Sequence, residues 1–106
     1  MGVKFLTNKV KSQIFLTKMI EKEFLIKNKN GLHARPAALL VKTTGKFKSD
    51  IFVSKDGVEV NGKSILGVMT LAAEPGSTIS VRIEGVDEED AIEAIEELIE
   101  SGFNED

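Results

Sequence analysis

The sequence predicts an α+β domain, an open-faced β-sandwich in which three helices cover one face of a four-stranded, mostly antiparallel sheet. Two observations lead to this class. From residue 19 onward the apolar side chains alternate between a strand period and a helix period, in the order β-α-β-β-α-β-α. Each half of that order contains a strand–helix–strand unit, which packs naturally as a sheet with its helices on one face.

The first strand and the first helix are predicted from two adjoining patterns. Residues 20–27 alternate in polarity as a strand does, and turn residues follow them. Residues 34–44 have helical spacing, with Pro36 in the first turn, where its missing N–H removes no hydrogen bond. Gly45 is a suitable end for this helix. The side chains expected to face the core are Phe24, Ile26, Ala37, Leu40, Val41 and Thr44.

A β-hairpin is predicted in the middle of the chain. Residues 49–54 form its first strand, with alternate apolar side chains. Asp56-Gly57 is a strong signal for a two-residue turn, because both positions of that turn need a positive φ. Val58 and Val60 then continue as the second strand of the hairpin.

A short helix, a strand and a final helix complete the order. Ser64 is a suitable N-cap for a helical pattern over residues 65–72, which Pro75 ends. Residues 78–84 alternate cleanly, and the last helix is predicted to begin at Asp87 with acidic residues in its first turn, on its exposed face. The apolar positions of these three elements are Ile65, Val68, Met69, Ala72, Ile79, Val81, Ile83, Ala91, Ile92, Ile95, Leu98 and Ile99.

Composition excludes several kinds of site. The chain has 106 residues, no cysteine and a single histidine, so disulfides, thiolate metal sites and histidine-rich metal sites are ruled out. A carboxylate-only metal site is left open by the composition but has no motif, and we predict no metal and no cofactor. No apolar run approaches the ~18 residues needed for membrane insertion. No basic cluster is interleaved with aromatic residues, which makes nucleic acid a poor candidate partner.

Charge is distributed unevenly along the chain. The net charge is -3, but residues 84–106 contain many acids and no base. This segment is read as a solvated acidic helix, or as a sign that the opposite face of the domain meets an acidic partner.

Residues 1–18 differ from the rest of the chain and are predicted to be a basic extension of a domain formed by residues 19–106. They contain lysines and no acid. The lysines interrupt any apolar stretch that a secretory signal would need. We favour Met19 as the natural translation start, with the preceding segment a read-through or cloning artefact; the alternative is a real basic amphipathic arm. We expect the domain to fold without it.

Gly31-Leu32-His33-Ala34-Arg35-Pro36-Ala37 is the segment most informative about function. It places His33 directly before a helix, where free backbone N–H groups and the helix dipole favour an anion. A phosphoryl group on His33 would lie against that helix start, and Arg35 could supply a positive charge to its oxygens. The residues therefore suggest nucleophilic catalysis or phosphoryl transfer by His33 with Arg35 as electrostatic partner. The alternative is that His33 is an ordinary cap or surface residue.

A resemblance to a known family favours phosphoryl transfer. The motifs that carry it are NKNGLHARPAALLVKTTGKFKSDI, VNGKSILGVMTLAAEPG and IEGVDEEDAIEAIEELI. Together they resemble the HPr family, the histidine-containing phosphocarriers of the bacterial phosphoenolpyruvate-dependent sugar phosphotransferase system. The likeness runs from Met19 to about Phe103 without gaps, and the combination of GLHARPA with KSILGVM is highly specific.

The resemblance implies a role for His33 and for the residues around it. His33 matches the family's phosphorylated histidine, which uses its Nδ1 atom, accepts the group from Enzyme I and passes it to IIA domains of sugar permeases. Arg35 matches the arginine that attends the phosphoryl group. Such a protein is a carrier and not an enzyme, and is expected to be a cytoplasmic monomer. The partner-binding positions are expected to be Asn30, Ala34, Ala38, Lys42, Ile65, Leu66 and Met69.

Ser64 has two interpretations that can hold together. It is an N-cap from the local pattern, and it matches the serine that an ATP-dependent HPr kinase/phosphorylase modifies in some family members. The alternative functions left open are a regulatory module, acting through phosphorylated Ser64 as corepressor of a catabolite-control transcription regulator, and a carrier in a nitrogen-related phosphotransfer chain. The sequence departs from the family at Gly62, where alanine is common, and in residues 1–18.

Overall fold

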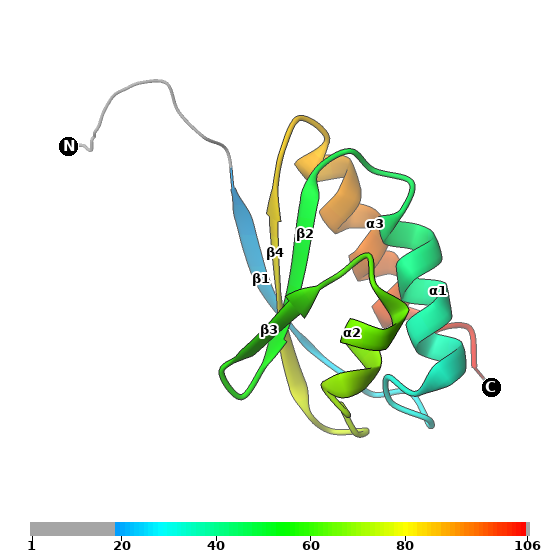
Figure 1. The fold of residues 1–106 in the computed structure, drawn as a ribbon. Helices are drawn as coiled ribbons and strands as arrows, with labels where there is room; N and C mark the ends of the chain where they lie inside the picture. Colours follow the sequence, from blue (N-terminus) through cyan, green and yellow to red (C-terminus); the bar gives the residue numbers. More distant parts are fainter. Residues whose placement is uncertain (1–18, 106) are drawn as a thin grey trace.

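Four strands form one sheet in the order β1-β4-β2-β3, with α1, α2 and α3 all on one face of it (Figure 1). The structure is a computed structural model that describes residues 19–105, so the predicted extension over residues 1–18 lies outside the described residues. All three strand pairs are antiparallel, and the predicted fold class and element order are confirmed. The elements are β1 (Ile20–Leu25), α1 (Ala34–Thr44), β2 (Asp50–Lys55), β3 (Val58–Asn61), α2 (Ile65–Thr70), β4 (Thr78–Glu84) and α3 (Glu88–Glu100).

Strand register places the apolar residues of neighbouring strands on the same face. Ile83 of β4 lies between Ile20 of β1 and Ile51 of β2, and Val81 pairs with Val53. Residues directly opposite in a ladder point to the same side of the sheet. The side that the helices cover is therefore the core, and the buried apolar residues are Phe24, Ile26, Leu32, Ala37, Leu40, Ile51, Val53, Val68, Leu71, Ala73, Ile79, Val81, Ile83, Ala91, Ile95, Ile99 and Phe103.

The predicted end of the second helix was wrong. α2 ends at Thr70 and not at residue 72, because Ala72 has a φ of 50°, which a right-handed helix does not allow. Of the four apolar positions predicted for this helix only Val68 is buried, whereas Ile65 and Met69 are 42% and 37% exposed. A helix this short reaches the core with one side chain and leaves the others at the surface.

The start of α3 is held by its own acidic residues. The Asp87 carboxylate accepts hydrogen bonds from the backbone N–H groups of Lys48 and Ser49 and from the Ser49 hydroxyl. These hydrogen bonds, the one from the Ser49 hydroxyl first, lower the pKa of Asp87 to about 2. The contact also explains why β2 begins at Asp50 and not at residue 49: Ser49 is bound to the α3 start instead of extending the ladder.

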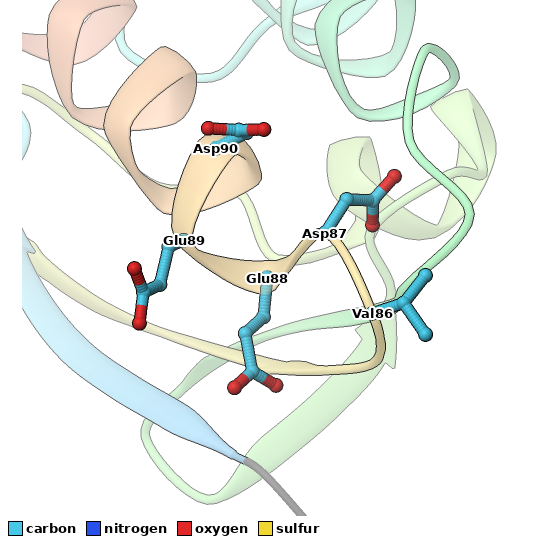
Figure 2. Close-up of a pocket in the computed structure, with 5 residues that line it drawn as sticks. All are labelled: Val86, Asp87, Glu88, Glu89 and Asp90. Atoms are coloured by element: carbon cyan, nitrogen blue, oxygen red, sulfur yellow. The ribbon is translucent and has the colours of Figure 1, made fainter.

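The expectation that the first-turn acids of α3 are all exposed was wrong for Glu88. Its side chain turns toward the sheet (Figure 2), it is buried, and its carboxylate accepts a hydrogen bond from the backbone N–H of Gly85. A hollow of about 210 Å³ is lined by residues 86–90, and two of its carboxylates, those of Asp87 and Glu88, are hydrogen bonded to neighbouring backbone N–H groups.

Candidate functional site

The loop before α1 presents His33 at the surface. Gly31 has a φ of 60°, and the next residue, Leu32, is fully buried. The Leu32 backbone N–H donates to the carbonyl oxygen of Ala73, at 2.9 Å, which joins this loop to the segment after α2. With Leu32 anchored below, His33 is the N-cap residue of α1, and its carbonyl oxygen accepts from the N–H of Ala37.

The His33 imidazole does not hydrogen bond to the backbone of α1, the helix that it precedes. Its side chain makes no capping hydrogen bond and is 57% exposed. The nearest acid is Glu74, whose Oε2 lies 3.8 Å from Nε2. At this distance the two groups are not hydrogen bonded. The exposed imidazole is therefore accessible to an incoming partner.

Arg35 is exposed in the first turn of α1. None of the acids in residues 19–105 forms an ion pair with it within 4.0 Å. It lines a hollow of about 290 Å³ together with Lys29, Asn30, Asn104 and Glu105. One side of the α1 start is therefore rich in donors and cations.

Ser64 is the N-cap of α2, as predicted. Its Oγ accepts a hydrogen bond from the backbone N–H of Gly67 at 3.0 Å. α1 and α2 lie side by side and run in opposite directions (Figure 1). Ser64 is consequently at the end of this helix pair where α1 finishes, whereas His33 is at the other end, and the two side chains do not meet.

The predicted partner-binding positions are all at the surface. Leu66 is 77% exposed, and Ile65 and Met69 accompany it on α2. The remaining positions, all exposed, are Asn30, Ala34, Ala38 and Lys42. Three exposed apolar side chains on one short helix form an apolar patch (Ile65, Leu66 and Met69), which lies on the same layer of helices as His33.

Two acids near the site were missed by the sequence analysis. Glu74 follows α2 and approaches His33 because Ala73 is hydrogen bonded to Leu32. Glu105 approaches the same loop from the C-terminal tail and accepts hydrogen bonds from Asn28 and Asn30. No motif links either acid to the histidine, and only the acidity of the C-terminal segment hinted at Glu105.

The described part of the chain was also searched for other kinds of site. None of its helices has the length and apolar character needed to cross a membrane. Within residues 19–105, no three histidine, aspartate or glutamate side chains lie together as a metal ion would require.

Comparisons with known proteins match nearly the whole described region. The family model for the PTS HPr component phosphorylation site matches residues 20–101. The phosphocarrier protein HPr of Xylella fastidiosa is 54% identical over 88 residues, which cover 83% of this chain and 99% of that protein. The HPr-like protein Crh of Halalkalibacterium halodurans is 52% identical and covers 77% and 98%. The crystal structure of HPr-C-His from Thermoanaerobacter tengcongensis has a TM-score of 0.80 and 53% identity, covering 82% and 98%.

Proposed function

Since this chain belongs to the HPr family of phosphocarrier proteins, we propose that His33 accepts a phosphoryl group from phosphorylated Enzyme I and passes it to IIA domains of sugar permeases in the cytoplasm. The observation that carries the proposal is the exposed imidazole of His33 at the start of α1, with Glu74 facing its Nε2. As a member of this family the protein is a carrier and not an enzyme.

The proposed transfer exchanges one bond to phosphorus for another. The Nδ1 lone pair of His33 attacks the phosphorus, the bond between phosphorus and the donor breaks, and a P–N bond to Nδ1 forms. Negative charge on the phosphoryl oxygens is favoured by the start of α1 and by the Arg35 guanidinium. The Glu74 carboxylate, 3.8 Å from Nε2, supplies a negative charge near the positive charge that the ring gains when Nδ1 is phosphorylated. Passing the group on reverses these steps.

The surface around His33 fits a carrier that must leave each partner quickly. The hollow beside Arg35 is open and polar, and the apolar patch on α2 is small. Small apolar surfaces surrounded by charge give fast association and fast dissociation, whereas a deep pocket would hold a ligand longer.

The test is incubation with phosphoenolpyruvate and catalytic Enzyme I, followed by intact mass. We expect one phosphoryl group per chain, stable in base and lost in acid, as a phosphoramidate is. A group that survives acid treatment would point to a serine ester instead and would contradict the proposal for His33.

Arg35→Ala is expected to slow transfer and leave the fold intact. The substitution removes the fixed charge at the transferring group, worth about 1–3 kcal/mol at an exposed site, or about 5- to 150-fold in rate. Stopped-flow measurement of transfer from phosphorylated Enzyme I checks this. Lys46→Ala, which removes a charge at the far end of α1, is the matched control and should transfer at the wild-type rate. Equal rates in the two variants would remove Arg35 from the mechanism.

A second role is regulation at Ser64 by an ATP-dependent HPr kinase/phosphorylase. It is supported by the neighbours of Ser64, and the similarity to the HPr-like protein Crh agrees with a regulatory variant of the family. A phosphate there is tolerated by the start of α2 and lies next to exposed Ile65 and Leu66. It would repel an acidic partner from the apolar patch. If this role dominates, the protein acts through phosphorylated Ser64 as corepressor of a catabolite-control transcription regulator. The remaining alternative is that it carries phosphoryl groups in a nitrogen-related phosphotransfer chain. The exposed His33 at the start of α1 favours the carrier.

Ser64→Asp is expected to slow His33 phosphorylation several-fold at low salt, because the added charge opposes docking of Enzyme I. Ser64→Asn is the matched control, since asparagine caps a helix as well as aspartate does without the charge. Rates should be measured at about 0.01 M and about 1 M salt, where the Debye length falls from about 30 to about 3 Å. Recovery at high salt in Ser64→Asp alone supports the electrostatic account. If both variants match wild type, Ser64 acts only as a cap.

A further inference from the structure

The turn between β3 and α2 is hydrogen bonded both to the sheet and to α1. The backbone N–H of Gly62 donates to the carbonyl oxygen of Ile51 in β2, at 2.7 Å. The carbonyl oxygen of Gly62 accepts a hydrogen bond from the Thr44 hydroxyl at the end of α1, at 2.8 Å. Gly62 therefore links the sheet to α1 two residues before Ser64, the N-cap of α2.

Gly62 lies so close to β2 that a side chain would not fit. A Cβ at this position would be 2.8 Å from Cγ2 of Ile51 and 3.2 Å from Cγ2 of Val53. Both side chains belong to the buried core, and a close-packed interior gives them little room to move aside. The core therefore fixes the position of the Gly62 carbonyl group that Thr44 binds.

Thr44 is the last residue of α1, and it is fully buried. Its hydroxyl has one proton to donate. The carbonyl oxygen of Gly62 is 2.8 Å from Oγ1, whereas that of Val41, in the same helix, is 3.2 Å away. The shorter hydrogen bond is thus the one that leaves the helix. Because a threonine side chain is stiff at χ1, Thr44 holds the Gly62 peptide against the end of α1.

Lys63 adds a second link to the segment after α1. Its ammonium group donates to the carbonyl oxygen of Phe47 at 2.7 Å, and its backbone N–H donates to Oδ1 of Asn61 at 2.8 Å. The backbone N–H of Ser64 then donates to the carbonyl oxygen of Asn61 at 3.1 Å. The backbone that leads into Ser64 is consequently fixed by groups from β2, β3 and the end of α1.

The Ser64 hydroxyl keeps a lone pair available at the end of this turn. Its oxygen has two lone pairs, and the only hydrogen bond that it accepts within residues 19–105 comes from the backbone N–H of Gly67. In phosphorylation by ATP, this oxygen bonds to the γ-phosphorus, the bond between that phosphorus and ADP breaks, and the hydroxyl proton passes to a base of the kinase. The reaction requires the oxygen to be aligned with the bond that breaks.

We propose that Thr44 is a positioning residue for the phosphorylation of Ser64, acting through its hydrogen bond to the Gly62 carbonyl. The inference rests on the regulation at Ser64 proposed above. Thr44 is fully buried and cannot contact a kinase, so it acts on the placement of the Ser64 oxygen and not on docking. A misplaced nucleophile lowers kcat, whereas a lost docking contact raises KM.

The test is Thr44→Val, which keeps the size and the branching of the side chain and removes the hydroxyl. With ATP and an HPr kinase, kcat for Ser64 phosphorylation is expected to fall about three- to tenfold at unchanged KM, the effect of one net hydrogen bond. Amide hydrogen exchange at Ser64 should become faster, because the turn is no longer bound to α1. Thr44→Ser restores the hydroxyl and should recover most of the lost kcat.

Thr43→Val is the matched control. It removes a hydroxyl from the preceding position of α1, where the side chain lines an open hollow beside α3. It should match wild type in kcat and in amide exchange. Phosphorylation of His33 through Enzyme I, at the other end of α1, should be unchanged in Thr44→Val, which shows that the fold is retained.

Several results would overturn the role of Thr44. They are a wild-type kcat in Thr44→Val, an equal loss in Thr43→Val, a lower kcat without faster exchange at Ser64, and no recovery in Thr44→Ser. A parallel loss of His33 phosphorylation would show a purely structural role instead. If wild-type protein gains no phosphoryl group on Ser64, the proposed regulation itself fails, and the inference fails with it.

Discussion

A His33→Ala protein is expected to take up no phosphoryl group from phosphoenolpyruvate through Enzyme I. The chain has one histidine and no cysteine, so no second imidazole or thiolate can replace the lost nucleophile. The effect should be complete loss of the acid-labile adduct, not a slower rate. Intact mass after prolonged incubation, with wild-type protein in parallel, measures it.

The same variant should keep its fold, which makes the result interpretable. The His33 side chain caps no backbone N–H of α1 and is more than half exposed, so its removal breaks no buried contact. Thermal unfolding should match that of wild type within a few degrees, in line with the small effect of most surface substitutions. An acid-labile phosphoryl group on a folded His33→Ala protein would show that another residue is the acceptor.

Gly31→Ala is expected to be the most destabilising small substitution near the site. Gly31 has a φ of 60°, and a Cβ at this position would overlap the carbonyl oxygen of Ala73. That oxygen accepts the hydrogen bond of Leu32, so it cannot withdraw without breaking the link between the loop and the segment after α2. The left-handed φ and the overlap together predict a loss of about 2–5 kcal/mol in the free energy of unfolding.

Gly57→Ala separates the cost of the left-handed φ from the cost of the steric overlap. Gly57 has a φ of 82° in the β2–β3 turn, but a Cβ there would meet no atom within 4 Å. It should lose only the conformational part, about 1–2 kcal/mol. Urea unfolding of both variants measures the difference. Equal losses would show that Ala73 moves aside and that the close approach of the two segments is not required.

Local features of the fold follow from the order of residues along the chain. The strand β4 and the helix α1 have the predicted bounds, because their apolar periods are set by neighbours within a few positions. The Asp56-Gly57 turn and the Ser64 cap are also confirmed, since each depends on one or two residues and their own backbone. The start of β2 moved because a distant group intervenes at Ser49, which Asp87 binds, whereas the end of α2 moved because Ala72 leaves the helical backbone conformation.

The candidate site also combines residues placed by local sequence with residues placed by tertiary structure. Local sequence places His33 and Arg35 at the start of α1, because a histidine before a proline-containing first turn needs no distant partner to be there. Which acids approach them was decided by tertiary structure alone. Glu74 comes near through the Leu32–Ala73 hydrogen bond, and Glu105 through a tail anchored by buried Phe103. Helix periods and caps arise from interactions between near neighbours. Contacts between residues 75 apart exist only once the sheet has formed and Phe103 is buried in the core.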